Sequence, residues 1–370
     1  MPIPTYHLES QSVLGRGAYG AVYKAIDTTS EHHVALKKTR VSQKVKRTIL
    51  QYESWVIQLL QGHPAIPILF GYGRLPHFEY LAMELLGPSV NECTSGGPIA
   101  VKTVTQVVLK MLSALEHIHK CGFVHGDIKP ENILCCPADP SRIVLIDYGV
   151  SRPIKRGPVN SNKLKLLVGT ADWASLNAHD NIDLSPRDDL ESLAYVALFL
   201  LRGNLPWISL AFHSWKKTRA IKAAESGAKL GANFPVEFGR LLDYARRLEY
   251  DQPPDYEELQ RQFAEIGIQI GNKDAKSPLD WSPVSAVIIS NGEGNKKSDS
   301  TPEDIDEDDD DEDDDEDEDD EVYPNSYRNW DISEWDMRSG RHRNLTLPPE
   351  QVELVKSKIP QVLIEDVVSW

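Results

Sequence analysis

Residues 123–134 read FVHGDIKPENIL and place three polar side chains at close spacing between two apolar runs. The carboxylate of Asp127 can accept a hydroxyl proton, the ammonium of Lys129 can meet a phosphate, and the amide of Asn132 can bind a cation. The stretch therefore predicts a loop that brings together a base, a phosphate-binding group and a metal ligand.

A second stretch, IVLIDYGV at residues 143–150, reads as a strand that ends at Asp147 and Gly149. A carboxylate at the end of a strand can hold a metal ion, although an aspartate and a glycine after a strand usually form only a turn. The order and spacing of the two stretches favour the functional interpretation.

A glycine-rich stretch lies near the start of the chain. Residues 14–25 read LGRGAYGAVYKA and contain Gly15, Gly17 and Gly20, followed by Val22. Glycines let a hairpin backbone approach phosphates closely, and a valine can cap a flat base. A dinucleotide-binding loop needs a helix after its glycines, whereas strand character continues here. The pattern therefore favours a hairpin, but glycine-rich hairpins are common, so the motif alone does not specify a nucleotide.

A lysine and a glutamate follow this hairpin. The stretch VALKK at 34–38 puts Lys37 on a strand between apolar neighbours, so that its side chain points inward and needs an anion. Glu53 lies in the middle of a predicted helix, in an otherwise apolar and aromatic context. Either residue alone also fits a solvated position. Together, behind the glycine hairpin, they predict a buried ion pair.

The predicted elements divide the chain into a β-rich part and a helical part. Residues 8–40 alternate apolar and polar side chains as antiparallel strands do, and 77–87 read as a further strand. A helix is predicted over 48–62, and it ends at a glycine. Further helices are predicted over 101–122, 187–202, 211–228, 235–248 and 255–266.

The charge of the chain is concentrated in one segment. The formal net charge is −16, and 18 of the 19 residues in 303–321 are Asp or Glu. Without them, 38 acidic residues face 40 basic ones. Such a run repels itself and buries no apolar surface, so we expect it to be disordered. We also expect a flexible linker over 269–302, and a tail over 322–370 with a short helix before Pro360.

Several classes of protein are disfavoured. The four cysteines form no CxxC pair, the first residues show no secretion signal, and the apolar stretch 193–201 is too short to span a bilayer. The acidic run repels nucleic-acid phosphates and anionic lipids. We therefore expect a reduced, soluble monomer in the cytoplasm or nucleus, with neither nucleic acid nor membrane as a partner.

Together these motifs resemble the protein kinase signature and, more closely, that of the casein kinase I family. MELLGPSV at 83–90 resembles that family's hinge. In GTADWASLNAH at 169–179, SLN is similar to its serine–isoleucine–asparagine, where most kinases carry an APE sequence. The resemblance covers roughly 8–266 and implies a bilobal protein kinase fold of the α+β class, with a β-rich N-lobe at 8–86 and a mainly helical C-lobe at 87–268. Further matching stretches lie at 187–196, 202–207 and 246–263.

The resemblance implies a Ser/Thr protein kinase that uses ATP and Mg²⁺. Lys37, held by Glu53, would bind the α- and β-phosphates. Met83 would lie behind the adenine pocket, and the backbone of Glu84 and Leu86 would form hydrogen bonds to the adenine. The phosphates would lie under Gly15, Gly17 and Gly20, and the adenine would be sandwiched by Leu14, Val22, Ala35 and Leu134.

The resemblance also assigns roles in the phosphoryl transfer. Asp127 would orient and deprotonate the hydroxyl of the substrate, while Asn132 and Asp147 would hold the metal ions. Lys129 marks the Ser/Thr class rather than the tyrosine class. Thr170 would brace both Asp127 and Lys129.

Three residues around the catalytic loop are expected to act indirectly. His125 is interpreted as a packing residue, and Asp189 as a buried group that holds the backbone of the loop. Gly126 stands where many kinases carry an arginine that binds a phosphorylated activation loop. HGD at 125–127 and DYG at 147–149 are similar to the vaccinia-related kinases, relatives of the casein kinase I group. The missing arginine therefore bears on regulation rather than on chemistry.

The sequence leaves the choice of substrate and two other functions open. Asp172 replaces an arginine that reads a substrate phosphate in casein kinase I, whereas 151–165 carry five bases and no acid, which favours acidic protein substrates. A catalytically silent scaffold is one alternative, against which the full set of catalytic residues argues. The other alternative is a binder of basic proteins, such as histones, through 303–321.

Overall fold

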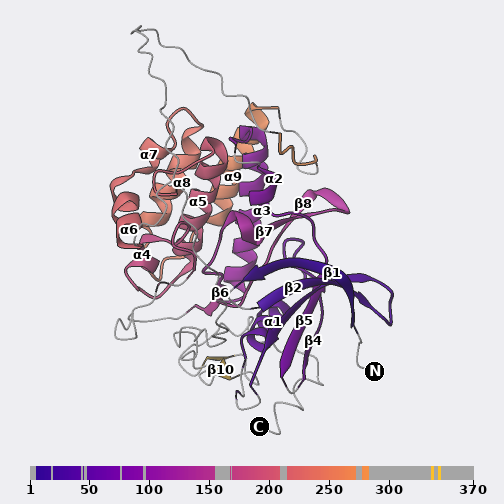
Figure 1. The fold of residues 1–370 in the computed structure, drawn as a ribbon. Helices are drawn as coiled ribbons and strands as arrows, with labels where there is room; N and C mark the ends of the chain where they lie inside the picture. The colour runs from indigo at the N-terminus through magenta and orange to yellow at the C-terminus, as the bar shows by residue number, and fades with distance from the viewer. Residues whose placement is uncertain are drawn as a thin grey trace, which may run out of the picture. The chain divides into compact units, whose positions relative to one another are not determined.

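The computed structural model describes residues 6–17, 20–42, 45, 48–75, 77–94, 97–154, 167, 169–208, 215–271, 277–282, 335–336 and 341–342. The predicted β-rich part, followed by a mainly helical part, is confirmed (Figure 1). The acidic run 303–321 and the short helix predicted before Pro360 lie outside the described residues. None of the described helices is long and apolar enough to cross a bilayer.

Five antiparallel strands form one sheet in the order β1-β2-β3-β5-β4. Lys37 of β3 lies in register between Val22 of β2 and Leu81 of β5. The sheet therefore places this lysine on a central strand, behind the hairpin formed by β1 and β2. The strands are β1 (Tyr6–Gly17), β2 (Gly20–Asp27), β3 (His33–Arg40), β4 (Leu69–Arg74) and β5 (Phe78–Glu84).

The glycine hairpin forms as predicted, and a strand rather than a helix follows its glycines. Gly15 pairs with Val22, and Gly17 pairs with Gly20. Gly20 has a φ of +120°, and a Cβ atom there would lie 2.3 Å from the carbonyl oxygen of Lys38. Only glycine fits this position.

The helix α1 (Ile49–Leu60) packs against β4 and β5. It begins after Thr48, whose hydroxyl accepts a hydrogen bond of 3.3 Å from the backbone N–H of Gln51. Its buried face includes Tyr52 and Glu53, and the glutamate has no exposed surface. Burying a carboxylate is costly unless a cation meets it, so the position of α1 depends on its partner in the sheet.

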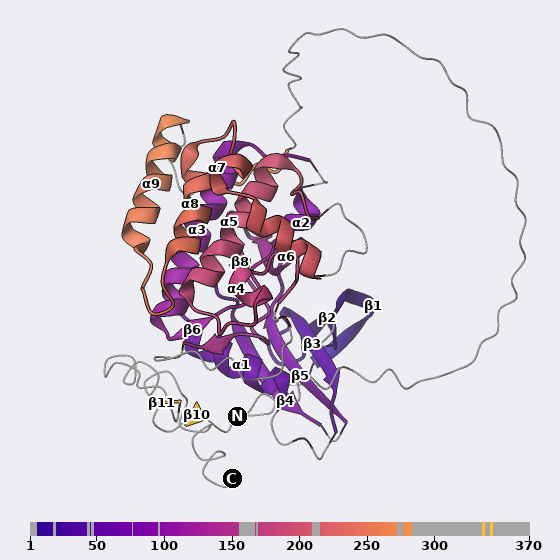
Figure 2. The ribbon, with the colours of Figure 1, turned by 90° about the vertical axis from the view of Figure 1, so that its left-hand side faces the viewer.

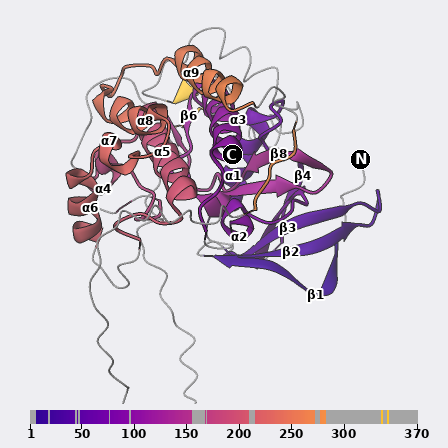
Figure 3. The same ribbon diagram turned by 90° about the horizontal axis from the view of Figure 1, so that it is seen from above.

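The C-terminal part is built around the helices α3 (Val101–Lys120) and α5 (Pro186–Arg202) (Figure 2). These two helices pack on each other, with α9 (Tyr256–Gln269) against α3 and α8 (Val236–Arg247) against α5. Shorter helices complete this part (Figure 3). They are α2 (Val90–Cys93), α4 (Leu176–His179), α6 (Trp215–Ala224) and α7 (Gly227–Leu230).

Two short strand pairs frame the loops that carry the predicted catalytic residues. β6 (Phe123–Val124) pairs with β9 (Arg152–Pro153), and β7 (Ile133–Cys136) pairs with β8 (Asp139–Leu145). One loop connects β6 to β7 and the other connects β8 to β9. Each loop therefore has one end at the β6–β9 pair and the other end at the β7–β8 pair. This topology brings the loop of Asp127 next to the loop of Asp147.

The predicted helix over 211–228 differs from the observed structure, which has the separate helices α6 and α7 in the described part of this stretch. The break has a local cause, because the hydroxyl of Ser226 accepts a hydrogen bond of 3.2 Å from the backbone N–H of Lys229 and caps a new helix. At the start of that helix, a Cβ atom on Gly227 would lie 2.0 Å from the carbonyl oxygen of Gly239. Close packing onto α8 therefore redirects the chain here.

The predicted flexible linker also differs from the structure over part of its length. α9 continues to Gln269, and residues 277–282 pack against the C-terminal part. Leu279 is buried, and its backbone N–H donates to the carbonyl of Pro140 at 3.1 Å. The hydroxyl of Thr103 donates to the carbonyl of Asp280 at 2.8 Å. In the predicted tail, β10 (Trp335–Asp336) pairs with β11 (Arg341–His342), which the sequence did not predict.

Candidate active site

The predicted ion pair between Lys37 and Glu53 is present and includes a third residue. The ammonium of Lys37 lies 2.8 Å from Oε2 and 3.1 Å from Oε1 of Glu53, and 2.9 Å from Oδ1 of Asp147. Burial alone would lower the pKa of Lys37, but the two carboxylates outweigh it and raise that pKa above its usual value. The lysine therefore stays charged, as a group that binds phosphates must.

Asp147 has an unusual backbone conformation. Its φ is +68°, in the left-handed region that residues other than glycine rarely adopt. Burial would raise the pKa of its carboxyl, but the charge of Lys37 outweighs this and keeps the pKa below the ordinary value. Strained backbone of this kind is found at functional sites. Here it orients an ionised carboxylate toward Lys37.

The carboxylate of Asp127 is held from several sides. Its Oδ1 accepts hydrogen bonds from the backbone N–H of Thr170 at 2.8 Å and from the hydroxyl of Thr170 at 2.9 Å. The ammonium of Lys129 donates to Oδ2 of Asp127 at 2.7 Å and to the hydroxyl of Thr170 at 2.8 Å. Thr170 thus contacts both residues, as predicted. This closed set of bonds fixes the orientation of the Asp127 carboxylate before any ligand arrives.

Asp189 anchors the backbone of the catalytic loop, which confirms the prediction. This buried carboxylate accepts hydrogen bonds of 2.8 Å from the backbone N–H groups of His125 and Gly126 and from the ring of His119. Burial lowers the pKa of His125, whose ring contacts the carbonyl of Ile146 at 3.1 Å. His125 therefore packs as a neutral ring, as expected, and supports the loop.

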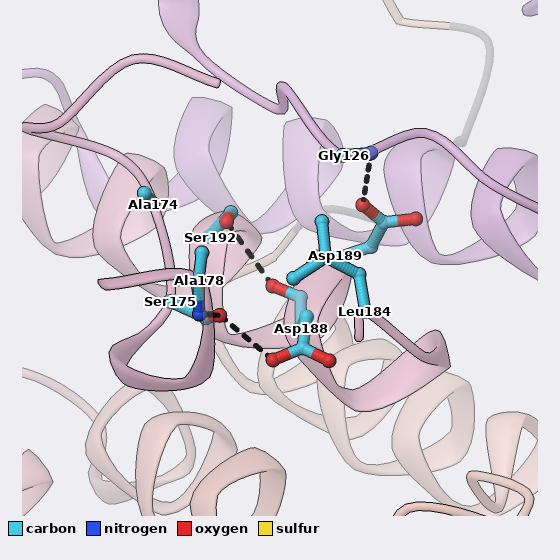
Figure 4. Close-up of a pocket in the computed structure, with 8 residues that line it drawn as sticks. All are labelled: Gly126, Ala174, Ser175, Ala178, Leu184, Asp188, Asp189 and Ser192. Carbon is cyan, nitrogen blue, oxygen red and sulfur yellow. Dashed lines mark hydrogen bonds between the residues drawn. The ribbon is translucent and has the colours of Figure 1, made fainter. Parts of the chain in front are cut away.

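Gly126 lies over a small cavity between the catalytic loop and α5. Figure 4 shows its backbone N–H pointing to the carboxylate of Asp189. Its φ is +80°, and a Cβ atom would meet Leu184 Cδ1 at 3.4 Å and the carbonyl of Val150 at 3.6 Å. A side chain would have room here, so the backbone conformation favours glycine more than the available space does. The cavity is lined by Gly126, Ala174, Ser175, Ala178, Leu184, Asp188, Asp189 and Ser192.

The predicted adenine site consists of apolar residues and a backbone segment. Ala35 of β3 pairs with Met83 of β5, which is buried. Leu134 of β7 forms an isolated bridge with Ser89, which joins the segment after β5 to the C-terminal part. Among the described residues, the backbone N–H of Leu86 has no hydrogen-bond partner. That donor stays available to a ligand.

Two of the residues expected to contact the adenine have groups that are exposed or already hydrogen-bonded. Leu14 on β1 is 51% exposed, so it can cover a ligand only as part of the hairpin edge. The backbone N–H of Glu84 donates to the carbonyl of Ile68 at 2.9 Å. Its side chain is bound by the guanidinium of Arg142. Neither of these groups of Glu84 is therefore free for the adenine.

The residues predicted to hold metal ions suit Mg²⁺. The amide nitrogen of Asn132 donates to the carbonyl of Asp127 at 2.9 Å, so the amide oxygen is the atom with which Asn132 would bind a metal ion. Oδ1 of Asp147 accepts from Lys37, and its second oxygen remains. In the described part of the chain, no group of three or more His, Cys, Asp or Glu forms a metal cage. Mg²⁺ prefers one or two protein ligands together with substrate phosphates, which fits this pair.

Two residues that contact the site were missed by the sequence analysis. The hydroxyl of Tyr52 on α1 donates to the carbonyl of Ser151 at 2.8 Å, and the ammonium of Lys222 on α6 donates to the carbonyls of Ala171 and Ala174. Tyr52 could have been found from the sequence, because it is an aromatic residue next to Glu53 in a predicted helix. Lys222 could not, since nothing in the neighbouring sequence indicates that it is buried.

Comparison with known families agrees with this geometry. A family model described as "protein kinase domain" matches residues 8–239. The match includes the glycine hairpin, the Lys37–Glu53 pair, and the loops of Asp127 and Asp147. The chain therefore belongs to the protein kinase domain family, whose members are phosphotransferases that generally use ATP and Mg²⁺.

Proposed function

We propose that this protein is a casein kinase I-like Ser/Thr protein kinase that transfers the γ-phosphoryl group of ATP to serine or threonine hydroxyls. The observation that carries the proposal is that the group of residues around Lys37 and the group around Asp127 are both formed in the same structure. Lys37 binds Glu53 and Asp147, while Asp127 binds Lys129 and Thr170. A catalytically silent scaffold has no need to maintain these bonds.

The proposed chemistry follows from the orientation of these groups. Asp127 accepts the proton of the substrate hydroxyl while the hydroxyl oxygen forms a bond to the γ-phosphorus. The bond between the γ-phosphorus and the oxygen of the β-phosphate breaks at the same time. Lys129, beside Asp127, meets the negative charge of the transferred group, and Lys37 binds the α- and β-phosphates. Asn132 and Asp147 would hold Mg²⁺, which would neutralise charge on the phosphates.

The casein kinase I-like character is supported by the way two motifs fit together. The hydroxyl of Ser175 and the amide nitrogen of Asn177 donate to Oδ1 of Asp188 at 2.7 and 2.9 Å. Ser175 and Asn177 belong to the SLN motif, and Asp188 belongs to RDDLES. Both motifs carry the resemblance, and here they meet at the buried carboxylate of Asp188.

The test is phosphorylation of matched peptides that differ only in the acceptor residue. With ATP and Mg²⁺ we expect incorporation of phosphate into the serine and threonine peptides and none into the tyrosine or alanine peptides. Removal of Mg²⁺ with a chelator should abolish the transfer. If freshly purified protein phosphorylates neither these peptides nor casein nor itself, the proposed function is wrong.

A further inference from the structure

Lys222 is a fully buried lysine that lies outside the catalytic residues described above. It lies on α6 and has no exposed surface. Its ammonium donates to the carbonyl oxygens of Ala171 at 2.7 Å and Ala174 at 2.8 Å, and it lies 3.4 Å from Nε2 of His179. A buried ammonium is costly unless acceptors surround it, so these contacts determine where the segment 171–174 can lie.

Aromatic rings complete the surroundings of this ammonium. It lies 4.8 Å from the ring centroid of Tyr195 and 5.4 Å from that of Trp207. Both distances are within the range of a cation–π interaction. Among the residues that the structure describes, no carboxylate forms an ion pair with Lys222. The amino group of Lys222 is therefore held by backbone carbonyls and rings, and most directly by the segment 171–174.

Trp207 holds the same segment at an intermediate point. Its indole N–H donates to the carbonyl of Asp172 at 2.9 Å. The carbonyls of Ala171, Asp172 and Ala174 are thus all bound from the side of α6 and Trp207. Three hydrogen bonds over four residues therefore hold this backbone in place.

The segment 171–174 directly follows the residue that holds the base. Thr170 donates to Oδ1 of Asp127 and accepts from Lys129. Its own carbonyl accepts hydrogen bonds of 2.9 Å from the backbone N–H groups of Trp173 and Ala174. A shift of the segment would therefore move Thr170 and change the surface beside the place where a substrate hydroxyl meets Asp127.

The helix that carries Lys222 is itself held in place by Arg246 of α8. The guanidinium of Arg246 donates to the carbonyls of Lys222 at 2.9 Å and Glu225 at 2.7 Å, and to the carboxylate of Glu191 at 3.1 Å. Glu191 of α5 in turn accepts a hydrogen bond of 3.3 Å from the backbone N–H of Leu176. The backbone that carries the Lys222 side chain is therefore held in place by α8 and α5.

We propose that Lys222 is the positioning residue of the segment 171–174, and that it fixes this segment for binding of the protein substrate beside Asp127. This inference rests on the proposed kinase function and deepens it, since it assigns a residue to the protein-substrate side of the site. Lys222 touches neither the nucleotide groups nor the reacting atoms. Its loss should therefore separate the binding of the protein substrate from the binding of ATP.

The test compares Lys222→Met with Lys217→Met, which removes the same charge from an exposed position of the same helix. At saturating ATP, we expect Lys222→Met to lower kcat/KM for a peptide substrate about 10- to 100-fold, because small displacements in a site have effects of this size. The KM for ATP should stay within about twofold of the wild-type value. Lys217→Met should resemble the wild type in both. Hydrogen exchange of the amides of Trp173 and Ala174 should be faster in Lys222→Met alone.

A second variant keeps the test decisive if Lys222→Met does not fold. Trp207→Phe retains a ring beside Lys222 and removes the hydrogen bond to Asp172, so we expect a smaller loss in the same direction. The inference is overturned, and the kinase function left intact, if both variants have the peptide kcat/KM of the wild type. If Lys222→Met does not fold, the same result for Trp207→Phe alone overturns it. A wild-type protein that phosphorylates no peptide would instead show that the proposed function itself is wrong.

Discussion

The hydroxyl of Tyr52 donates a hydrogen bond of 2.8 Å to the backbone carbonyl of Ser151. Tyr52 precedes Glu53 on α1, and Ser151 lies four residues after Asp147. The bond thus joins the helix that carries one partner of Lys37 to the segment that carries the other. It requires no phosphate, and both residues are buried.

Tyr52→Phe should weaken catalysis without removing any catalytic group. A single buried hydrogen bond contributes on the order of 1 kcal/mol, so we expect kcat/KM for ATP to fall roughly fivefold. The ring remains, and the fold should be retained. Steady-state kinetics and the circular dichroism spectrum of the two proteins measure this. Unchanged kinetics would show that α1 is held by its other contacts alone.

Activity should not depend on phosphorylation of the segment between Ser151 and Thr170. Gly126 offers no cationic side chain to such a phosphate, and the Tyr52 bond already connects α1 to this segment. Phosphatase-treated protein should therefore retain its rate in a peptide assay. A large loss of rate that rephosphorylation restores would contradict this expectation.

Asp127→Asn should lower turnover by at least about 100-fold, which is the size of the contribution that a positioned general base makes. An asparagine keeps the shape but cannot accept the proton. Binding of ATP, measured by titration calorimetry, should be nearly unchanged because Lys37, Asn132 and Asp147 remain. Asp251→Asn at an exposed position serves as the control. Equal turnover of the wild type and Asp127→Asn would exclude Asp127 as the base.

Lys222 should make the stability of the fold depend on pH. Burial lowers its pKa from the usual 10.5 to about 7 in the folded protein. Between these values the unfolded chain keeps a proton that the folded chain has lost, so stability rises as the pH increases above 7. Relative to Lys222→Met, the wild type should gain about 2 kcal/mol in the free energy of unfolding between pH 7 and pH 9. Urea unfolding measures the free energy of unfolding of both proteins. A difference between them that stays constant from pH 7 to pH 9 would refute the lowered pKa of Lys222.

Truncation after residue 295 should reveal whether the acidic run competes with substrates. The run 303–321 and the bases in 151–165 are opposite charges on one chain. The composition of the residues before the run predicts a random coil, which over the 20 residues from 283 to 302 would reach about 25 Å. Tethering at such a distance gives an effective concentration near the millimolar range. We expect the truncated protein to have a lower KM for an acidic peptide at low salt, and a similar KM at high salt because salt screens exposed charges. Equal KM values at low salt would assign the run no inhibitory role.

Much of the site was predictable because its residues occur in motifs whose spacing reflects local structure. The glycine hairpin, the Lys37–Glu53 pair, and the loops of Asp127 and Asp147 were all predicted, and the structure brings them together. The predictions that differed depend on packing. α6 and α7 separate where Gly227 meets Gly239, and residues 277–282 pack against the C-terminal part although their composition is that of a linker.

The order of the elements and the identity of the charged groups at the site could be predicted from the amino-acid sequence, since periodicity and motif spacing are local properties of the chain. The burial of Lys222 under the segment 171–174 and the contact of Tyr52 with Ser151, 99 residues away, follow from packing alone. Such contacts join parts of the chain that are distant in sequence. They arise because a buried donor must find an acceptor wherever the packing of α1, α5 and α6 places one.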